Sequence, residues 1–347
     1  MSVLNLLLAA KKSIVSQFVA AVHFTTPFVT AYPWSVAGFG TKFANPATLP
    51  TSTAVSVAFT QSGDAVAVGH ATSPFITTYP WSGAGFGTKF ANPSTLPAGS
   101  TGYGVAFSPS GDAVAVSHSV SSFVSAYPWS GAGFGTKFAD PSTLPAGDSR
   151  SIAFSPSGDA VAVGHANSPN ITAYPWSGSG FGTKFADPST LPVGTCWGTA
   201  FSPSGDAIAV SHNASPFISV YPWSVSGFGT KFSNPSTLPT GVGDGVAFSP
   251  SGDAVAVAHA ISPFITAYPW SGSGFGTKFT NPATLPTGLG WGVAFSPSAD
   301  AIAVRHEVSP FITTYPWSGS GFGTKFTNPA TLPAGIVRGV AFTQIVS

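Results

Sequence analysis

A tripeptide that recurs seven times at almost constant spacing constrains this sequence more than any other feature. Tyr-Pro-Trp begins at positions 32, 79, 127, 174, 221, 268 and 315, so successive copies lie 47 or 48 residues apart. The motif Gly-Phe-Gly-Thr-Lys-Phe follows each copy in step. Self-similarity at a period of about 40 to 50 residues is typical of chains built from repeated structural units. We therefore expect one repeat domain rather than several unrelated domains.

One period of the repeat reads as four short β-strands. Residues 104–107 begin the first strand, and the turn Ser-Pro-Ser-Gly-Asp at 108–112 leads into a second strand at 113–118. Residues 123–127 form the third strand, and the fourth lies around residues 136–138. Four strands in each period predict an all-β fold, a β-propeller of four-stranded antiparallel blades.

The two ends of the chain carry complementary parts of a repeat. Residues 19–23 align with the second strand of the next repeat, so the N-terminal repeat lacks a first strand. Residues 339–342 supply a first strand that no second strand follows. We predict that this C-terminal strand completes the N-terminal blade and closes a seven-bladed β-propeller over residues 15–347. Residues 1–14 are left as an N-terminal arm.

Two stretches of the repeat resemble known propellers. The turn unit Phe-Ser-Pro-Ser-Gly-Asp-Ala-Val-Ala-Val at 107–116 resembles the inner hairpin of WD40-type blades. The motifs at 262–270 and 281–286 resemble propeller repeats of bacteriophage virion proteins, especially tail-associated proteins of phages that infect actinobacteria. The chain departs from the WD40 pattern, because no Trp-Asp dipeptide ends its third strand and no Gly-His precedes its first. The resemblance implies a virion propeller and transfers no functional residue.

Charge and composition exclude several kinds of partner. Only 7% of the residues are charged and the formal net charge is +1, which argues against nucleic-acid binding. The single cysteine, Cys196, cannot form an intrachain disulfide or a thiolate metal cluster. No apolar run approaches the roughly 18 residues of a membrane helix. The sequence predicts no cofactor, no metal site and no membrane insertion.

The repeated polar residues have structural explanations. The histidines end the second strand, where a ring of metal ligands is the alternative to hydrogen bonding within the blade. The lysines are assigned to the fourth strand, where a charge discourages pairing between sheet edges, and an anion-binding rim is the alternative. Six aspartates are assigned to the turn between the first two strands. The histidines are His23, His70, His118, His165, His212, His259 and His306.

One position in each repeat departs from the repetition. Four residues before the phenylalanine of the first strand, the chain carries Val55, Tyr103, Arg150, Trp197, Asp244, Trp291 and Arg338. Arg305 and Glu307, which flank His306, are also unrepeated. By analogy with WD40 blades, the loop that leads into the first strand and the loop that joins the second strand to the third open on the same face, around the channel mouth. Tyrosine, tryptophan and arginine are common in binding hot spots, and drift at exposed positions is the alternative. The predicted ligand-binding rim is Tyr103, Arg150, Trp197, Asp244, Trp291, Arg338, Arg305 and Glu307.

These features together predict a non-enzymatic binding or structural protein of a phage virion. The arm would contact other virion proteins, and the rim would bind a host-surface glycan or receptor. A free bacterial, extracellular, lectin-like propeller that binds carbohydrate is the alternative. A glycan-cleaving hydrolase is a second alternative. Such an enzyme would need two carboxylates about 5 to 10 Å apart. Only Asp148, Asp244 and Glu307 lie outside the repeated acidic positions.

Overall fold

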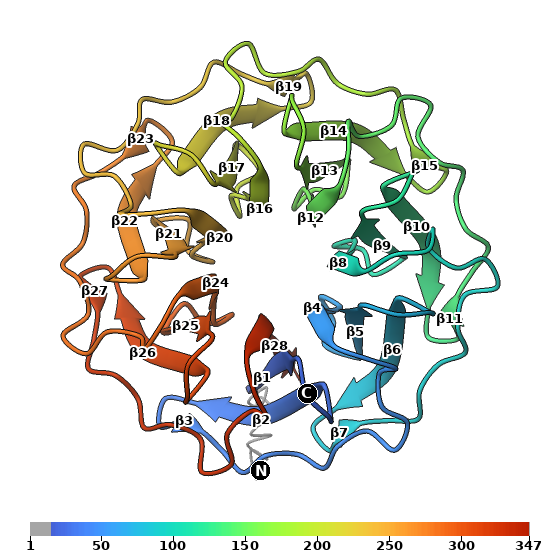
Figure 1. The fold of residues 1–347 in the computed structure, drawn as a ribbon, viewed down its shortest axis with the longest axis horizontal. Coiled ribbons are helices and arrows are strands. Elements are labelled where there is room, and N and C mark those ends of the chain that lie inside the picture. Colours follow the sequence, from blue (N-terminus) through green and yellow to red (C-terminus); the bar gives the residue numbers. More distant parts are fainter. Residues whose placement is uncertain (1–14, 347) are drawn as a thin grey trace, which may run out of the picture.

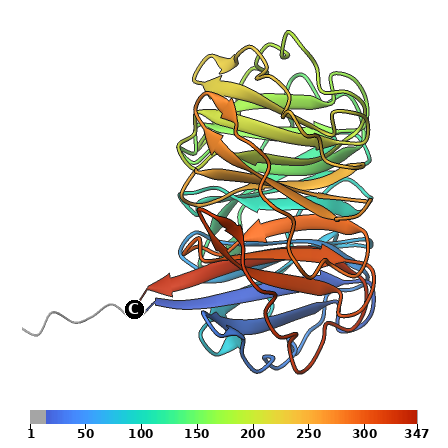
Figure 2. The same ribbon diagram turned by 90° about the vertical axis from the view of Figure 1, so that its left-hand side faces the viewer.

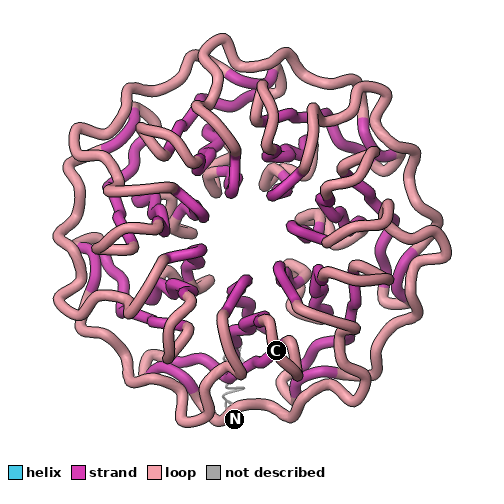
Figure 3. Tube along the Cα trace, in the orientation of Figure 1, coloured by secondary structure: helices cyan, strands magenta, loops and turns pink. Residues whose placement is uncertain are grey.

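The fold is a ring of seven four-stranded antiparallel sheets around a central channel (Figure 1). This computed structural model describes residues 15–346. Every described element is a β-strand, joined by loops and turns (Figure 3). The predicted all-β, seven-bladed propeller is therefore confirmed.

The strands fall into four sets from the channel outward. The inner strands are β4 (Ala54–Phe59), β8 (Gly102–Phe107), β12 (Ser149–Phe154), β16 (Cys196–Phe201), β20 (Gly243–Phe248), β24 (Gly290–Phe295) and β28 (Val337–Val346). The second strands are β1 (Val15–His23), β5 (Ala65–His70), β9 (Ala113–His118), β13 (Ala160–His165), β17 (Ala207–His212), β21 (Ala254–His259) and β25 (Ala301–His306). The third strands are β2 (Val29–Ser35), β6 (Ile76–Ser82), β10 (Val124–Ser130), β14 (Ile171–Ser177), β18 (Ile218–Ser224), β22 (Ile265–Ser271) and β26 (Ile312–Ser318). The outer strands are β3 (Gly38–Phe39), β7 (Gly85–Phe86), β11 (Gly133–Phe134), β15 (Gly180–Phe181), β19 (Gly227–Phe228), β23 (Gly274–Phe275) and β27 (Gly321–Phe322).

The ring closes where the two ends of the chain meet. The first blade has the strand order β28-β1-β2-β3, so its inner strand comes from the C-terminus. The ladder between β1 and β28 runs from the pair Val15 and Val346 to the pair His23 and Val337. Figure 2 shows the ends of these two strands extending beyond the rest of the disc on one side. The predicted closure by complementary half-blades is confirmed.

The outer part of each blade differs from the prediction. The third strand β10 continues through Pro128 to Ser130, and the outer strand β11 holds only Gly133 and Phe134. Gly133 has a φ of 101°, which allows the tight turn that brings the outer strand forward. Lys137 therefore lies beyond the outer strand, and the assignment of the lysines to its edge is wrong. Each lysine ammonium instead donates a hydrogen bond to the Asn or Asp three residues later, as Lys89 does to Asn92.

The repeated Tyr-Pro-Trp motif fastens neighbouring blades together. The ring of Trp176 meets three phenylalanines edge-on, with centroids 5.0 to 5.3 Å away. Phe154 and Phe181 belong to its own blade, whereas Phe138 comes from the preceding one. The hydroxyl of Tyr174 donates a 2.8 Å hydrogen bond to the carbonyl of Thr143 on the segment between the two blades. The three phenylalanine contacts recur at all seven tryptophans, and the tyrosine hydrogen bond recurs at six of the seven junctions, Tyr127 being the exception.

The seven histidines are fully buried and hydrogen-bonded within their own blades. In His165, Nδ1 lies 2.8 Å from the carbonyl oxygen of Asn167, and Nε2 lies 2.9 Å from the hydroxyl of Thr172. A carbonyl can only accept, so Nδ1 carries the proton and Nε2 accepts from the hydroxyl. Burial lowers the pKa of His165 to about 4. The structural explanation of the histidines is confirmed, with a Ser or Thr of the third strand as the partner.

These histidines should make the ring sensitive to acid. Burial lowers the histidine pKa values from 6.5, to about 4 at six of the seven positions. The unfolded chain therefore binds protons first as the pH falls. The stability that the neutral, buried histidines contribute is fully present above pH 6.5 and is lost as the pH falls toward 4. Each histidine contributes up to about 1.4 kcal/mol per pH unit in that window. Urea unfolding across this range should show a steep fall in the free energy of unfolding as the pH is lowered. In His212→Gln, the slope of that free energy against pH should be smaller by the amount that one bound proton contributes. An unchanged slope in the variant would contradict this account.

Candidate functional site

The position that departs from the repetition is a β-bulge in every inner strand. In the sixth blade, β20–β23, Gly243 pairs with His259 and Gly245 pairs with Ala258, so Asp244 has no partner in the ladder. The same skip occurs in the six other inner strands. A bulge leaves one residue unpaired and can redirect its side chain. This geometry explains how the variable side chains leave the contacts between blades and face the channel.

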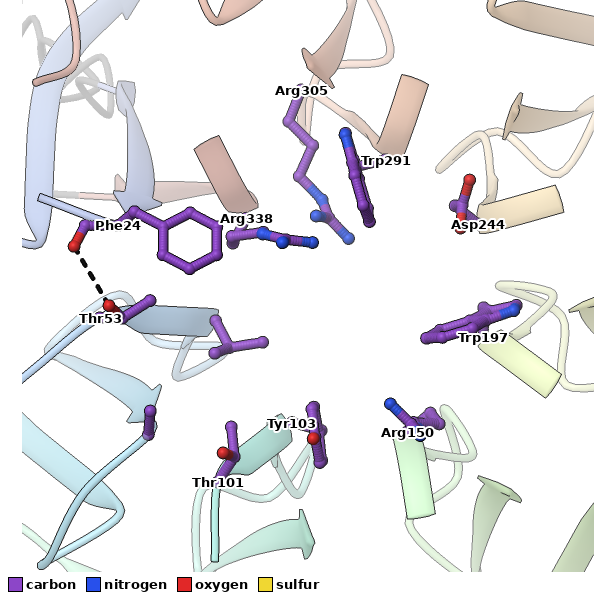
Figure 4. Close-up of a pocket in the computed structure, with 12 residues that line it drawn as sticks. Phe24, Thr53, Thr101, Tyr103, Arg150, Trp197, Asp244, Trp291, Arg305 and Arg338 are labelled. Atoms are coloured by element: carbon purple, nitrogen blue, oxygen red, sulfur yellow. Dashed lines mark hydrogen bonds between the residues drawn. The ribbon is translucent and has the colours of Figure 1, made fainter. Parts of the chain in front are cut away.

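The seven bulged residues line one cavity at the mouth of the channel. Its volume is about 460 Å³, which suits a small molecule. The remaining lining residues are Arg305 and four from the loops around the mouth, namely Phe24, Thr53, Ala71 and Thr101. Figure 4 shows these side chains converging from different blades. The prediction that both sets of loops open on one face is confirmed.

Two arginines of the mouth are stacked between aromatic rings. The guanidinium carbon of Arg150 lies 4.8 Å from the ring centroid of Tyr103 and 4.9 Å from that of Trp197. The guanidinium carbon of Arg338 lies 4.5 Å from Phe24 and 4.0 Å from Trp291. Such cation–π contacts hold a charged group in place while it is partly removed from water. The two stacks therefore present ordered guanidinium groups to the cavity.

Asp244 lies between Trp197 and Trp291 in the order of the blades (Figure 4). Burial raises the pKa of Asp244 to about 7, although the charges of Arg305 and Arg338 oppose this shift. The ion pairs within residues 15–346 are Lys137–Asp140, Arg150–Asp148 and Lys184–Asp187, so none of them includes Asp244. The mouth therefore holds a carboxyl group that changes its charge near neutral pH and is close to two cations.

Arg305 reaches the channel across its own inner strand. It pairs with Gly292 in the ladder between β24 and β25, and the equivalents of Arg305 in the other blades are Gly, Ser, Ala or Val. A Cβ atom added to Gly292 would lie 2.3 Å from Nε of Arg305. The absence of a side chain at Gly292 is thus what lets the arginine cross. Burial lowers the pKa of Arg305 to about 9 and Asp244 opposes the shift, so the guanidinium stays charged at neutral pH.

Several buried donors of the mouth have no hydrogen-bond acceptor among the described residues. They are Nε of Arg150 and Arg338 and the indole Nε1 atoms of Trp197 and Trp291. Buried polar groups without partners are uncommon in folded proteins and call for an explanation. These atoms have almost no accessible surface, so a ligand in the cavity would contact other atoms of the same arginine side chains.

Most of the predicted rim meets in this cavity. Tyr103, Arg150, Trp197, Asp244, Trp291, Arg338 and Arg305 line it. Glu307 does not line the cavity, although its charge opposes the lowering of the pKa of Arg338 by burial. The prediction did not include Phe24, Thr53, Val55, Ala71 or Thr101, because short or apolar residues give no chemical signal in the sequence.

Other parts of the described chain carry less chemistry. A cavity of about 680 Å³ at the opposite mouth is lined by phenylalanines, prolines, Gln61 and Ser108, with no ionisable residue. Burial raises the pKa of Cys196 to about 12, so its thiol is unreactive at neutral pH. Among residues 15–346, no three His, Cys, Asp or Glu side chains are grouped to hold a metal ion. No helix in that range is long and apolar enough to span a membrane.

No protein-family model and no curated protein matches this sequence. The fold itself matches solved bacterial proteins. One, of unknown function, comes from Desulfotomaculum acetoxidans, with 14% identity and a TM-score of 0.68 over 94% of this chain and 98% of that one. A Bacteroides uniformis protein provisionally named a 6-phosphogluconolactonase has 12% identity and a TM-score of 0.71 over 94% and 99%. A periplasmic gluconolactonase from Pseudomonas aeruginosa has 13% identity and a TM-score of 0.68 over 95% and 99%. Identities this low show a shared fold.

The virion interpretation is wrong, whereas the lectin-like alternative stays a prediction. The matching structures are bacterial proteins, two of them named as lactonases, and nothing in them points to a phage particle or to WD40 repeats. The resemblance misled because the repeated motifs build the blade junctions, and one fold can carry many functions. The expectation of a non-enzymatic protein is supported only in part, since propellers of this fold include named lactonases. The arm expected to anchor the protein, residues 1–14, lies outside the described residues.

Asp244 should lower the stability of the folded protein at alkaline pH. Its pKa is about 7 in the folded chain against an ordinary value of 3.8, so the folded chain releases this proton later than the unfolded chain. The free energy of unfolding therefore falls across that window, by up to about 4 kcal/mol. Asp244→Asn removes this loss. Urea unfolding measures the difference in the free energy of unfolding between the variant and the parent. That difference should favour the variant more at about pH 8 than at about pH 4.5. The same difference at both pH values would contradict the raised pKa.

Proposed function

We propose that the channel mouth binds a small anionic lactone and opens its ring by hydrolysis. The observation that carries the proposal is that Asp244, a half-buried carboxyl group with no ion pair among residues 15–346, lies near Arg305 and Arg338 in a cavity of about 460 Å³. The substrate class is suggested by two proteins with the same fold, a gluconolactonase and one provisionally named a 6-phosphogluconolactonase.

The charges of the lining favour an anionic substrate. Three guanidinium groups, those of Arg150, Arg305 and Arg338, face the cavity together with the single carboxyl group of Asp244. Guanidinium groups bind phosphate and carboxylate oxygens with paired hydrogen bonds. Arg150 is held between two rings on the far side of Trp197 from Asp244, so we assign it to an anionic substituent of the substrate.

Ring opening requires a base and a group that stabilises an oxyanion. In the proposed step, the Asp244 carboxylate takes a proton from water as the water oxygen attacks the lactone carbonyl carbon. Arg305 and Arg338 donate hydrogen bonds to the carbonyl oxygen as it gains negative charge. The bond between the carbonyl carbon and the ring oxygen then breaks. The ring oxygen takes the proton from Asp244, and the product is a hydroxy acid.

Hydrolysis should depend on unprotonated Asp244. With 6-phosphogluconolactone as substrate, we expect opening faster than the spontaneous reaction. Because the base must be ionised, kcat/KM should rise with pH through about 7 and then level off. Asp244→Asn should lower kcat about 100-fold or more. Proton release in weakly buffered solution measures the rate.

Asp253→Asn is the matched control. Asp253 belongs to the same blade, but its carboxylate accepts hydrogen bonds from Ser249 and Ser251 in the turn at the other end of the inner strand. The control should keep the parental rate. A parent protein that opens the lactone no faster than buffer would exclude the reaction, and equal losses in both variants would exclude Asp244 as the base.

Arg150 should set the preference for a charged substrate. Arg150→Gln should raise KM for 6-phosphogluconolactone about 10-fold or more, since hydrogen bonds to charged groups contribute about 1.5 to 3 kcal/mol. It should change KM for uncharged gluconolactone much less. A similar rise for both substrates would show that Arg150 supports the cavity rather than the anionic group.

A further inference from the structure

The mouth of the channel is chemically uneven around its circumference. Charged side chains that line it come from the fourth, sixth, seventh and first blades, as Arg150, Asp244, Arg305 and Arg338. Between Arg338 and Arg150, the second and third blades contribute no charged lining residue. Of the seven bulged positions, the one on the second blade carries a small aliphatic residue, Val55.

The second blade therefore leaves an uncharged recess beside the stacked cations. Val55 is half-buried there, and Thr53, Ala71 and Thr101 complete its surface. The hydroxyl of Thr53 is already used, since it donates a 3.2 Å hydrogen bond to the carbonyl of Phe24 (Figure 4). The ring of Phe24, which is 37% exposed, borders the same side. This recess thus offers a ligand methyl groups, an aromatic ring and one hydroxyl, that of Thr101 on the third blade.

We infer that the substrate carries an uncharged, mainly apolar substituent that lies against Val55 while its anionic end is held by the arginines. This inference rests on the anion-binding role proposed above for the mouth. Contact with apolar surface favours a substituent that loses water on binding. An additional charged or strongly hydrated group would find no partner on the second blade. Val55 is then a residue that determines specificity, because its small size creates the recess.

The inference can be tested by binding, without turnover. The probes are straight-chain carboxylates from acetate to hexanoate, titrated into the protein by calorimetry. Affinity should rise up to about fourfold with each methylene added. Val55→Trp should fill the recess, and a tryptophan is tolerated at this bulge because Trp197 and Trp291 occupy the equivalent position of other blades. We expect this variant to bind hexanoate at least 10-fold more weakly than the parent and acetate within about twofold.

Two further variants fix the interpretation. Val36→Trp, at a valine that is 81% exposed and does not line the cavity, should leave the whole series unchanged. Val55→Ala, which enlarges the recess, should keep acetate binding and retain the increase with chain length. Equal weakening of acetate and hexanoate by Val55→Trp, or no weakening of either, would overturn the inference. Failure of the parent to bind any of these carboxylates would overturn it as well. Carboxylate binding without lactone opening would instead reject the proposed reaction and leave the recess supported.

Discussion

The ladder between β1 and β28 is the interaction on which both the ring and the mouth depend. Nine residue pairs join the two ends of the described chain, and they turn a row of blades into a closed channel. The same ladder brings Phe24, which follows β1, within 4.5 Å of the guanidinium of Arg338, a residue of β28. If this strand pairing were lost, the buried faces of the first blade would be exposed and one of the two cation–π stacks would disappear. Closure therefore builds the candidate site as well as the fold.

Within that ring, the bulge separates the residues that hold blades together from those that face the channel. Val246 and Phe248 pack in the cluster between two blades, whereas Asp244, on the same strand, has no ladder partner. The next residue has the opposite requirement. A Cβ atom on Gly245 would lie 2.7 Å from Cα of Gly292, so β20 and β24 approach too closely there for a larger side chain. Chemistry can thus vary at one position of each inner strand without disturbing the contacts beside it.

The parts of the molecule that the sequence could predict are those that packing repeats seven times. The strand order, the closure by half-blades and the variable ring from Tyr103 to Arg338 follow from periodicity, because every blade junction makes the same demands. Periodicity could not show the bulge, or the route of Arg305 across Gly292, since both depend on how the strands pair. It also misplaced the outer strand, whose two residues are too few to show an alternating pattern. The resemblance to virion repeats rested on motifs that pack the blades together. It did not include the residues of the channel mouth.

The mouth is chemically asymmetric because only some of the seven equivalent blades carry a charged residue there. Only 7% of the residues are charged, and most of them are fixed in turns and loops by neighbouring polar groups. Asp244 and Arg305 are different, because burial opposes the charge on each of them and neither is in an ion pair within residues 15–346. Such groups destabilise a fold unless a ligand or a reaction uses them. The seven blades, each with the same histidine hydrogen bonds, and the aromatic contacts at their junctions supply the stability that makes this local loss tolerable. A repetitive ring is therefore suited to holding a few ionisable groups in the unpaired state that binding or catalysis requires.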